Sequence, residues 1–260
     1  MTPSIDLAGR LLPALALVGC RSTRSPSATD ILERAETAVR PVGVPAPRTI
    51  VIEGTYEYTG QGGQHGVAPL YQHWRAPGVL YQEVQAPFGQ MRRWFGGERG
   101  WASRPEFPNR PLGNAELSET RRDAALYQPW AMPGEYQSFA YEGRRQRGGK
   151  EYDVVAAQSR LGKTERFWFD PSTGLVRILD VWEEGPEGLR SVGGGEFYES
   201  HYLVDDYRPV GKHTLPFRIR RVRPNSSVDM RFASVRVDAP VDTLREQAPP
   251  VRADTMSRRQ

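Results

Sequence analysis

Cysteine and histidine, the residue types that most often act as nucleophiles, bases or metal ligands, are few and scattered in this sequence. The chain has one cysteine, Cys20, and four histidines, His65, His73, His201 and His213. The histidines lie in separate segments without HExxH or His-x-His spacing, so no metal site is predicted. A single cysteine excludes an internal disulfide and a multi-cysteine metal site. No cofactor is indicated.

Motifs for catalysis and nucleotide binding are incomplete. The sequence has no GxSxG motif of a serine hydrolase. The loop GQGGQHG at residues 60–66 lacks a third glycine at the nucleotide-binding spacing and leads into another strand, so we interpret it as a hairpin loop. The pair Asp205-Asp206 suits a turn beside Tyr207 and Pro209 better than a calcium site. We therefore predict no catalytic residues and a non-enzymatic protein, with an unrecognised hydrolase as the enzymatic alternative.

Charge patterning favours contact with lipid over contact with nucleic acid. The chain of 260 residues carries 35 basic and 31 acidic side chains, a formal net charge of +4. A mildly basic surface suits anionic lipid headgroups, but acidic residues are interleaved throughout, unlike a nucleic-acid footprint. We interpret the basic runs at residues 144–147 and 220–223 as solvated strand edges and faces, with a lipid headgroup site as the alternative, and no nucleic-acid partner is predicted.

Residues 11–20 indicate the one modification that the sequence predicts. The segment LLPALALVG at 11–19 is apolar but too short to span a bilayer, as in a secretory signal peptide. Leu17-Val18-Gly19-Cys20 resembles the bacterial lipobox. That resemblance implies that Cys20 becomes the mature N-terminus, carries a thioether-linked diacylglycerol and is acylated there, for example by palmitate. A buried core cysteine is the alternative, and it fits poorly because a polar segment follows.

These features divide the chain into four parts. We expect a lipoprotein signal peptide over residues 1–19, the lipidated cysteine and a flexible tether over 20–28, a β-rich domain over 29–247 and a polar disordered tail over 248–260. Three acyl chains anchor a protein stably, so a membrane is a predicted partner through the lipid anchor. Because Arg21 and not an acidic residue follows the cysteine, we expect a bacterial cell envelope location on the outer membrane, facing the periplasm.

Short strands separated by local turns account for most of the domain. The clearest hairpin joins strands at 164–169 and 175–182 through the turn Asp170-Pro171-Ser172-Thr173-Gly174. Pro171 presets φ for the turn, and Gly174 supplies the positive φ needed to enter the second strand. Apolar side chains occur on both faces of the first strand, so we expect a sheet that is covered on both sides.

Two helices are expected beside the strands. The first runs from Thr29 or Asp30 to Val39, and the second from Asn114 to Gln128. The second helix has a thin apolar stripe, which is typical of packing on a sheet edge or over the mouth of a sheet. The proline-rich stretch before it, residues 103–113, is expected to be a loop.

The order of these segments resembles a known family. In chain order they are a helix ILERAETAVR, a strand with IEGTYEY, then WRAPG, WFGGERGWAS, a helix ELSETRRDAALYQPW, FWFDPSTGLVRI, DDYRPVGKHTLPFRI and MRFASVRVDAPVD. Over about residues 29–244 this series resembles the outer-membrane lipoprotein-sorting proteins related to the carrier LolA and the acceptor LolB. The resemblance implies a mainly β (α+β) fold: a strongly curved antiparallel sheet, an incomplete barrel, whose apolar concave face is covered by two short helices and accepts acyl chains.

Aromatic residues are numerous enough to line a cavity as well as to fill a core, with six Trp, 11 Tyr and nine Phe. Ordinary core packing is the alternative for each of them. By alternation along the strands, the candidate cavity residues are Ile52, Tyr56, Tyr81, Trp94, Trp101, Phe167, Phe169, Phe217 and Ile219.

Two classes of function follow from these predictions. The first is a non-enzymatic, lipid-anchored envelope protein that captures acyl chains, of a lipid or of an acylated protein, by reversible burial of apolar surface. The alternative is a structural or protein-interaction lipoprotein subunit of a larger envelope complex, which would use the same sheet as a docking surface.

Overall fold

The computed structural model describes residues 25–87, 89–105, 107–126, 136–159, 162–184 and 197–248. Within these ranges the chain forms two α-helices, two short 3-10 segments and one 13-stranded sheet. The helices are α1 (Ala28–Val39) and α2 (Asn114–Leu126), and the 3-10 segments are η1 (Gln61–Gly63) and η4 (Thr243–Glu246). The strands are β1 (Thr49–Thr59), β2 (His65–Arg75), β3 (Val79–Ala86), β4 (Gly89–Gly96), β5 (Arg99–Arg104), β6 (Phe107–Pro111), β7 (Tyr136–Arg147), β8 (Lys150–Ser159), β9 (Thr164–Phe169), β10 (Val176–Glu184), β11 (Phe197–Val210), β12 (His213–Arg223) and β13 (Ser226–Val237).

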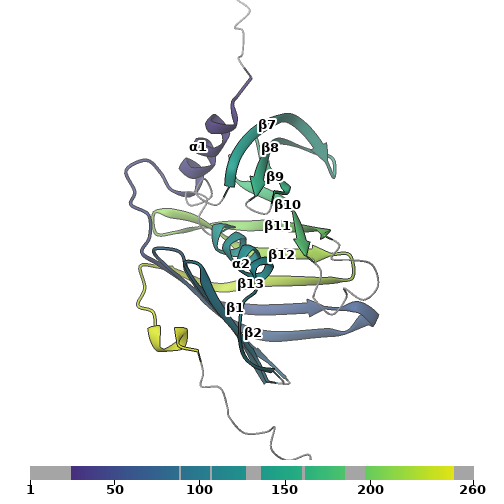
Figure 1. Ribbon diagram of the computed structural model, residues 1–260. Helices are drawn as coiled ribbons and strands as arrows, with labels where there is room; N and C mark the ends of the chain where they lie inside the picture. The colour runs from purple at the N-terminus through teal and green to yellow at the C-terminus, as the bar shows by residue number, and fades with distance from the viewer. Residues whose placement is uncertain are drawn as a thin grey trace, which may run out of the picture.

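The sheet consists of two meanders joined in the middle. Its strand order is β6-β5-β4-β3-β2-β1-β13-β12-β11-β10-β9-β8-β7, and every neighbouring pair is antiparallel. The first strand therefore pairs with the last, and β6 and β7 form the two edges. Figure 1 shows the sheet bending around α2, with α1 beside the end that contains β7 and β8. The predicted fold class, a curved antiparallel sheet that forms an incomplete barrel with two helices, is confirmed.

The connection between the two edge strands explains why α2 lies inside the curve. In the sequence α2 follows β6 and precedes β7, so the chain must pass from one edge of the sheet to the other at this point. The helix contacts β3 and β4 on one side and β10 on the other. It thus bridges the two meanders across the concave face, as Figure 1 shows.

The hairpin at residues 170–174 forms as predicted. The carboxylate of Asp170 accepts hydrogen bonds from the backbone N–H groups of Ser172 (2.9 Å) and Thr173 (3.2 Å), which closes the turn. Gly174 has φ +76°, and its N–H donates to the Asp170 carbonyl oxygen at 2.8 Å. The turn chemistry of the sequence thus sets the register between β9 and β10.

Helix α1 begins slightly earlier than the sequence predicts. Its N-cap is Ser27, whose hydroxyl oxygen accepts from the Asp30 N–H at 3.1 Å while the Asp30 carboxylate accepts from the Ser27 N–H at 2.7 Å. This reciprocal capping box satisfies two backbone donors at the helix start, which explains why Asp30 serves inside the first turn and not as the cap.

The proline-rich stretch before α2 contains a strand that the sequence analysis treats as a loop. Strand β6 pairs with β5 through Trp101–Pro111, Ala102–Arg110 and Arg104–Phe107. Proline has no N–H to donate to a sheet ladder, but β6 is an edge strand and needs a partner on one side only. The edge position therefore permits a strand here, and the predicted loop is wrong for the residues of β6.

A bulge in the pairing of β1 with β13 allows the middle of the sheet to bend. The pairing of β1 with β13 shifts register between Glu53 and Gly54. A Cβ at Gly54 would lie 2.1 Å from the Arg231 carbonyl oxygen and 2.9 Å from the Phe232 Cα. Only glycine fits where the two backbones approach so closely.

Some of the predicted segments lie outside the described residues. These are the signal peptide at residues 1–19, the lipidated Cys20 and positions 249–260 of the polar tail. Within the part of the chain that the structure describes, no helix has the length and apolar character needed to cross a membrane.

Candidate functional site

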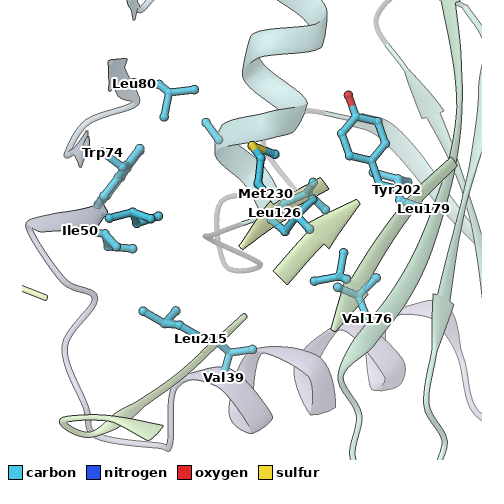
Figure 2. Close-up of a cluster of buried hydrophobic side chains, with 14 of the residues drawn as sticks. Val39, Ile50, Trp74, Leu80, Leu126, Val176, Leu179, Tyr202, Leu215 and Met230 are labelled. Atoms are coloured by element: carbon cyan, nitrogen blue, oxygen red, sulfur yellow. The ribbon is translucent and has the colours of Figure 1, made fainter. Parts of the chain in front are cut away.

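The concave face of the sheet holds the main cluster of buried apolar side chains. At one end α1 presents Ile31, Ala35 and Val39, all at most 3% exposed, to the sheet. Figure 2 shows Val39 beside Leu215 of β12, while other apolar side chains converge from both meanders. The others labelled there are Ile50, Trp74 and Leu80 from β1–β3 and Val176, Leu179 and Tyr202 from β10 and β11, with Leu126 and Met230 between them. This end of the concave face is therefore an apolar region covered by a helix.

Six of the nine predicted cavity residues belong to this concave cluster. Ile52, Phe167, Phe169, Phe217 and Ile219 are buried members, and Tyr56 is partly buried against them. Phe167 stacks on Phe169, with ring centroids 6.3 Å apart, and meets Tyr136 edge to face at 5.3 Å. The structure places these six side chains together, and a ligand-binding role for them stays a prediction.

The other three predicted residues, Tyr81, Trp94 and Trp101, lie on the opposite, outer face and do not line the concave face. The register pairs Tyr81 with His73 and Trp94, and Trp94 with Trp101, so these side chains form one row across β2–β5. The inner row one residue away consists of Trp74, Leu80 and Phe95. Because both rows are aromatic or aliphatic, alternation separates the two faces without showing which one is concave.

The C-terminal segment covers the aromatic row on the outer face. In η4, the Glu246 carboxylate pairs with Arg75 (2.7 Å) and His73 (3.1 Å), and the Trp101 indole N–H donates to the Glu246 carbonyl oxygen at 3.1 Å. His73 is fully buried and stacks on Tyr81 with ring centroids 5.2 Å apart. Burial lowers the pKa of His73 despite its contact with Glu246.

A small pocket lies between this segment and the outer face. It has a volume of about 360 Å³ and is lined by Tyr81, Glu83, Gln90, Arg92, Asp242, Leu244, Arg245 and Gln247. Both acidic and basic side chains line it, and Arg245 lies over the Tyr71 ring at 4.4 Å from the centroid. The pocket is thus a polar gap beside the segment and is separate from the concave face.

Charged side chains fix α2 to the concave face, whereas apolar side chains fix α1. The Glu119 carboxylate contacts three arginines: Arg221, Arg223 at 3.2 Å and Arg93 at 3.5 Å. One turn further along the helix, Asp123 accepts from Arg93 at 2.6 Å. Burial opposes ionisation of Glu119, but the three arginines outweigh it and hold the pKa of its carboxyl well below the usual range.

A second ionic group lies beside the first. Arg122 of α2 donates to Glu165 of β9 at 2.8 Å, with side-chain exposures of only 6% and 1%, and Tyr136 donates to the other Glu165 oxygen at 2.8 Å. Burial raises the pKa of Glu165 in spite of these two partners. Arg122 also lies 4.0 Å from Glu183, which joins the second group to the first.

Glu183 of β10 connects the charged groups to the aromatic side chains of the concave face. It accepts hydrogen bonds from Arg223 (2.6 Å), Tyr198 (3.1 Å) and Tyr202 (3.2 Å). The part of the concave face under α2 thus holds four arginines, Arg93, Arg122, Arg221 and Arg223, and four carboxylates, Glu119, Asp123, Glu165 and Glu183. The two sets balance, so this polar region carries no net charge. The interpretation of residues 220–223 as solvated is wrong for Arg221 and Arg223, which lie under α2. Sequence analysis did not identify this region, because its members come from five separate elements.

One further group on the outer face could in principle offer metal ligands. Asp180, Glu199 and His201 place ligand atoms within 4.8 Å of one another. The Asp180 carboxylate already accepts from Trp168 (2.7 Å), Arg147 (2.8 Å) and His201 (2.8 Å). Both of its oxygens are therefore used within the protein, and the group is best described as an ion-pair and hydrogen-bond network.

Several solved structures have a similar fold. A LolA superfamily protein from Nitrosomonas europaea superimposes with a TM-score of 0.59 at 10% identity, over 85% of this chain and 97% of its own. A DUF1329 family protein from Desulfovibrio piger gives a TM-score of 0.59 at 12% identity, over 85% and 95% of the two chains. A Vibrio parahaemolyticus domain described as an outer membrane lipoprotein-sorting protein domain gives 0.58 at 8% identity, over 85% and 98%.

These likenesses define the class of fold. The chain has a LolA/LolB-like fold, as the resemblance in the sequence implied. At identities this low the likeness concerns the fold alone. The chain matches no protein-family model and no curated protein sequence.

Proposed function

We propose that this protein is a lipid-anchored bacterial envelope protein that binds acyl chains, of a lipid or of a lipoprotein, on the concave face of its sheet. One observation carries the proposal: apolar side chains from both meanders converge on a concave face that is covered by helices and not by a second sheet. A helical cover can move away while the sheet keeps its own hydrogen bonds. The LolA/LolB-like fold supports the same conclusion.

Binding would follow from burial of apolar surface, without a covalent step. Each Å² of acyl chain removed from water contributes about 25 cal/mol, so a long chain supplies enough free energy to compete with a lightly packed helix. Helix α2 is such a helix, because few apolar side chains, among them Leu117, Ala124 and Leu126, hold it to the core. Most of its other contacts with the strands are ion pairs, which exchange for water when the helix moves, and Arg121 also lies over the Phe95 ring at 5.4 Å from the centroid.

The proposal includes the membrane anchor and the location. The lipobox-like segment that ends at Cys20 supports attachment of the mature protein to a membrane, with the domain in the periplasm. Arg21 after the cysteine favours the outer membrane. The anchor would keep the concave face near the lipids from which a ligand must come.

The experiment is native mass spectrometry with lipid extraction on residues 21–260 secreted into a bacterial periplasm. A lipid that co-purifies at one molecule per chain is the expected result, and it would also identify the ligand. A clean apo mass, together with no uptake of added fatty acid or phospholipid, would contradict the proposal.

A second candidate is a structural or protein-interaction subunit of a larger envelope complex. The observation that favours it is the ionic network under α2, since ion pairs occupy the part of the concave face that a long acyl chain would also need. A protein that never releases α2 would use its outer surface to contact protein partners. The apo result described above, followed by crosslinking in intact cells, would support this candidate.

A further inference from the structure

Glu119 places a carboxylate among three arginines that come from two different strands. Arg93 belongs to β4, and Arg221 and Arg223 belong to β12, so the strands reach this point from the two separate meanders. Arg223 donates to one Glu119 oxygen at 3.2 Å, while Arg221 and Arg93 contact the other. The side chains of these four residues are between 13% and 25% exposed. The arrangement is that of an anion held by arginines, with the anion supplied by the helix.

The buried side of α2 is unusual for a helix that covers an apolar face. Thr120, Arg122 and Asp123 are at most 8% exposed and face inward together with Leu117 and Ala124. Charged groups at such positions require partners, because an unpaired buried charge is strongly destabilising. The strands therefore carry arginines and glutamates that match α2, and those groups stay on the concave face if α2 moves away.

If α2 moves away, the strand residues that faced it have a net charge that can be counted. Helix α2 contributes Glu119, Asp123 and Arg122, a net charge of −1. The strands contribute Arg93, Arg221 and Arg223 against Glu165 and Glu183, a net charge of +1. Without α2, the concave face would therefore hold one uncompensated positive charge. A single anionic group is the ligand that restores neutrality there.

The arginines adjoin the apolar part of the concave face. The Arg221 guanidinium lies 5.8 Å from the centroid of the Tyr202 ring, and its Nη1 lies 3.3 Å from the Tyr202 hydroxyl oxygen. Tyr202 is 1% exposed and belongs to the same apolar cluster as Leu179 and Met230. A ligand with its anionic end at the arginines would have its apolar part directly against this cluster.

We propose that Arg93, Arg221 and Arg223 bind the anionic group of an amphiphile whose acyl part lies on the apolar concave face, and that Glu119 occupies this place in the absence of ligand. The inference rests on the proposed function, because it assumes that the concave face takes up acyl chains. The anionic group is a carboxylate or a phosphodiester, since both present oxygens that arginine binds with paired, charge-assisted hydrogen bonds. Ligand and α2 then compete for the same three side chains.

The test compares anionic ligands with uncharged or zwitterionic ligands of equal chain length on residues 21–260, which omit Cys20, by titration calorimetry. Dodecanoate is compared with dodecanol, and dihexanoyl phosphatidylglycerol with dihexanoyl phosphatidylcholine. These two comparisons distinguish a fatty-acid carboxylate from the headgroup of an anionic phospholipid. The wild type should prefer at least one anionic ligand to its uncharged or zwitterionic counterpart.

Two substitutions should act in opposite directions. Arg221→Gln should weaken binding of the anionic ligand about 10- to 100-fold, as expected for loss of a hydrogen bond between charged groups, and should change dodecanol binding little. Glu119→Gln removes the competing carboxylate and should strengthen binding of the anionic ligand more than binding of dodecanol, which gains only from the weaker attachment of α2. Arg218→Gln is the matched control, because Arg218 lies on the same strand but pairs with Asp229 at 2.6 Å, away from α2. Arg218→Gln should change the binding of neither the anionic ligand nor dodecanol.

The possible results distinguish the arginine site from acyl binding on the concave face. If neither anionic ligand binds better than its counterpart, and neither Glu119→Gln nor Arg221→Gln changes binding, the arginine site is overturned and acyl binding stays intact. No binding of any of the four ligands would overturn both. If Arg221→Gln does not fold, as judged by circular dichroism, Glu119→Gln decides alone: unchanged or weaker binding of the anionic ligand contradicts the proposal.

Discussion

The Glu119 Oε2 of α2 and the Arg223 Nη2 of β12 lie 3.2 Å apart, although the two residues are 104 positions apart in the chain. One turn further along the same helix, Asp123 and Arg93 of β4 form a 2.6 Å ion pair. Helix α2 is thus tied to both meanders by charged side chains. A helix held in this way should respond to salt and to anionic ligands more than a helix held by apolar packing.

The bulge at Gly54 should tolerate no side chain. Gly54→Ala would place a Cβ 2.1 Å from the Arg231 carbonyl oxygen, and backbone atoms cannot move aside without disturbing the pairing of β1 with β13. We expect the free energy of unfolding to fall by at least about 1–3 kcal/mol, measured by urea denaturation. The control is Gly66→Ala on the neighbouring strand β2, where a Cβ would meet nothing within 4 Å. Equal stability of the two variants would argue against the bulge geometry.

The buried pair Arg122–Glu165 should behave as a unit. Arg122→Met leaves the Glu165 carboxylate buried without its cation, and we expect a loss of about 3–5 kcal/mol in the free energy of unfolding. The double variant Arg122→Met/Glu165→Met should recover most of that loss, since no buried charge remains. Additive losses in urea denaturation would mean that the two side chains do not interact.

The same single variant should show a pH dependence of defined sign. Burial already raises the pKa of Glu165 above 4.5, and removal of Arg122 should raise it further. A carboxyl group whose folded pKa exceeds its unfolded pKa stabilises the fold at low pH and loses this contribution as the pH rises. Arg122→Met should therefore be closer to wild-type stability at pH 5 than at pH 8. A deficit that is the same at both pH values would contradict the assignment.

Acid should loosen the C-terminal segment from the outer face. Burial lowers the pKa of His73 below 6.5, so its stabilising contribution is lost as the pH falls below about 6.5, where the unfolded chain takes up the proton first. The pKa of Glu246 is also lowered, because Arg75 and His73 outweigh its burial, and this contribution is lost below about pH 4.5. Both effects have the same sign.

Hydrogen exchange of residues 242–247 measures this loosening directly. After correction for the intrinsic exchange rate, protection should decrease between pH 7 and pH 5 in the wild type. His65→Gln is the control, since His65 is an exposed residue whose ring contacts Glu57 and not the C-terminal segment. His73→Gln should remove most of the decrease above pH 5. A wild-type segment whose protection does not change would show that His73 has no part in holding it.

Attachment to the membrane should depend on Cys20. Cys20→Ser removes the thiol to which a diacylglycerol would be linked, so most of the protein should move from the membrane fraction to the soluble fraction. Cell fractionation with a high-salt wash measures the distribution. The Cys20→Ser protein would disprove the lipobox assignment if it stayed in washed membranes as the wild type does.

Local patterns in the sequence determined most of the strands and the way they connect. The turn at residues 170–174 sets the β9–β10 register through its own side chains, and alternation correctly groups Glu165, Phe167 and Phe169 on one face. Such features depend on neighbours within a few residues. For the same reason the order of the strands within each meander follows from a series of local turns, whereas the pairing of β1 with β13 joins the two ends of the domain.

Only the tertiary structure decided which face of each strand is concave and what covers it. Tyr81 and Trp101 are large, mainly apolar side chains that a core could take up as well as Leu80 and Phe95. The choice of face therefore depends on the direction in which the whole sheet bends and on the path of α2 between its edges. The partners of Glu119 are likewise set by that path, since β4 and β12 meet α2 only once both meanders have curved around it. Contacts between residues so far apart in the chain leave no local pattern from which they could be predicted.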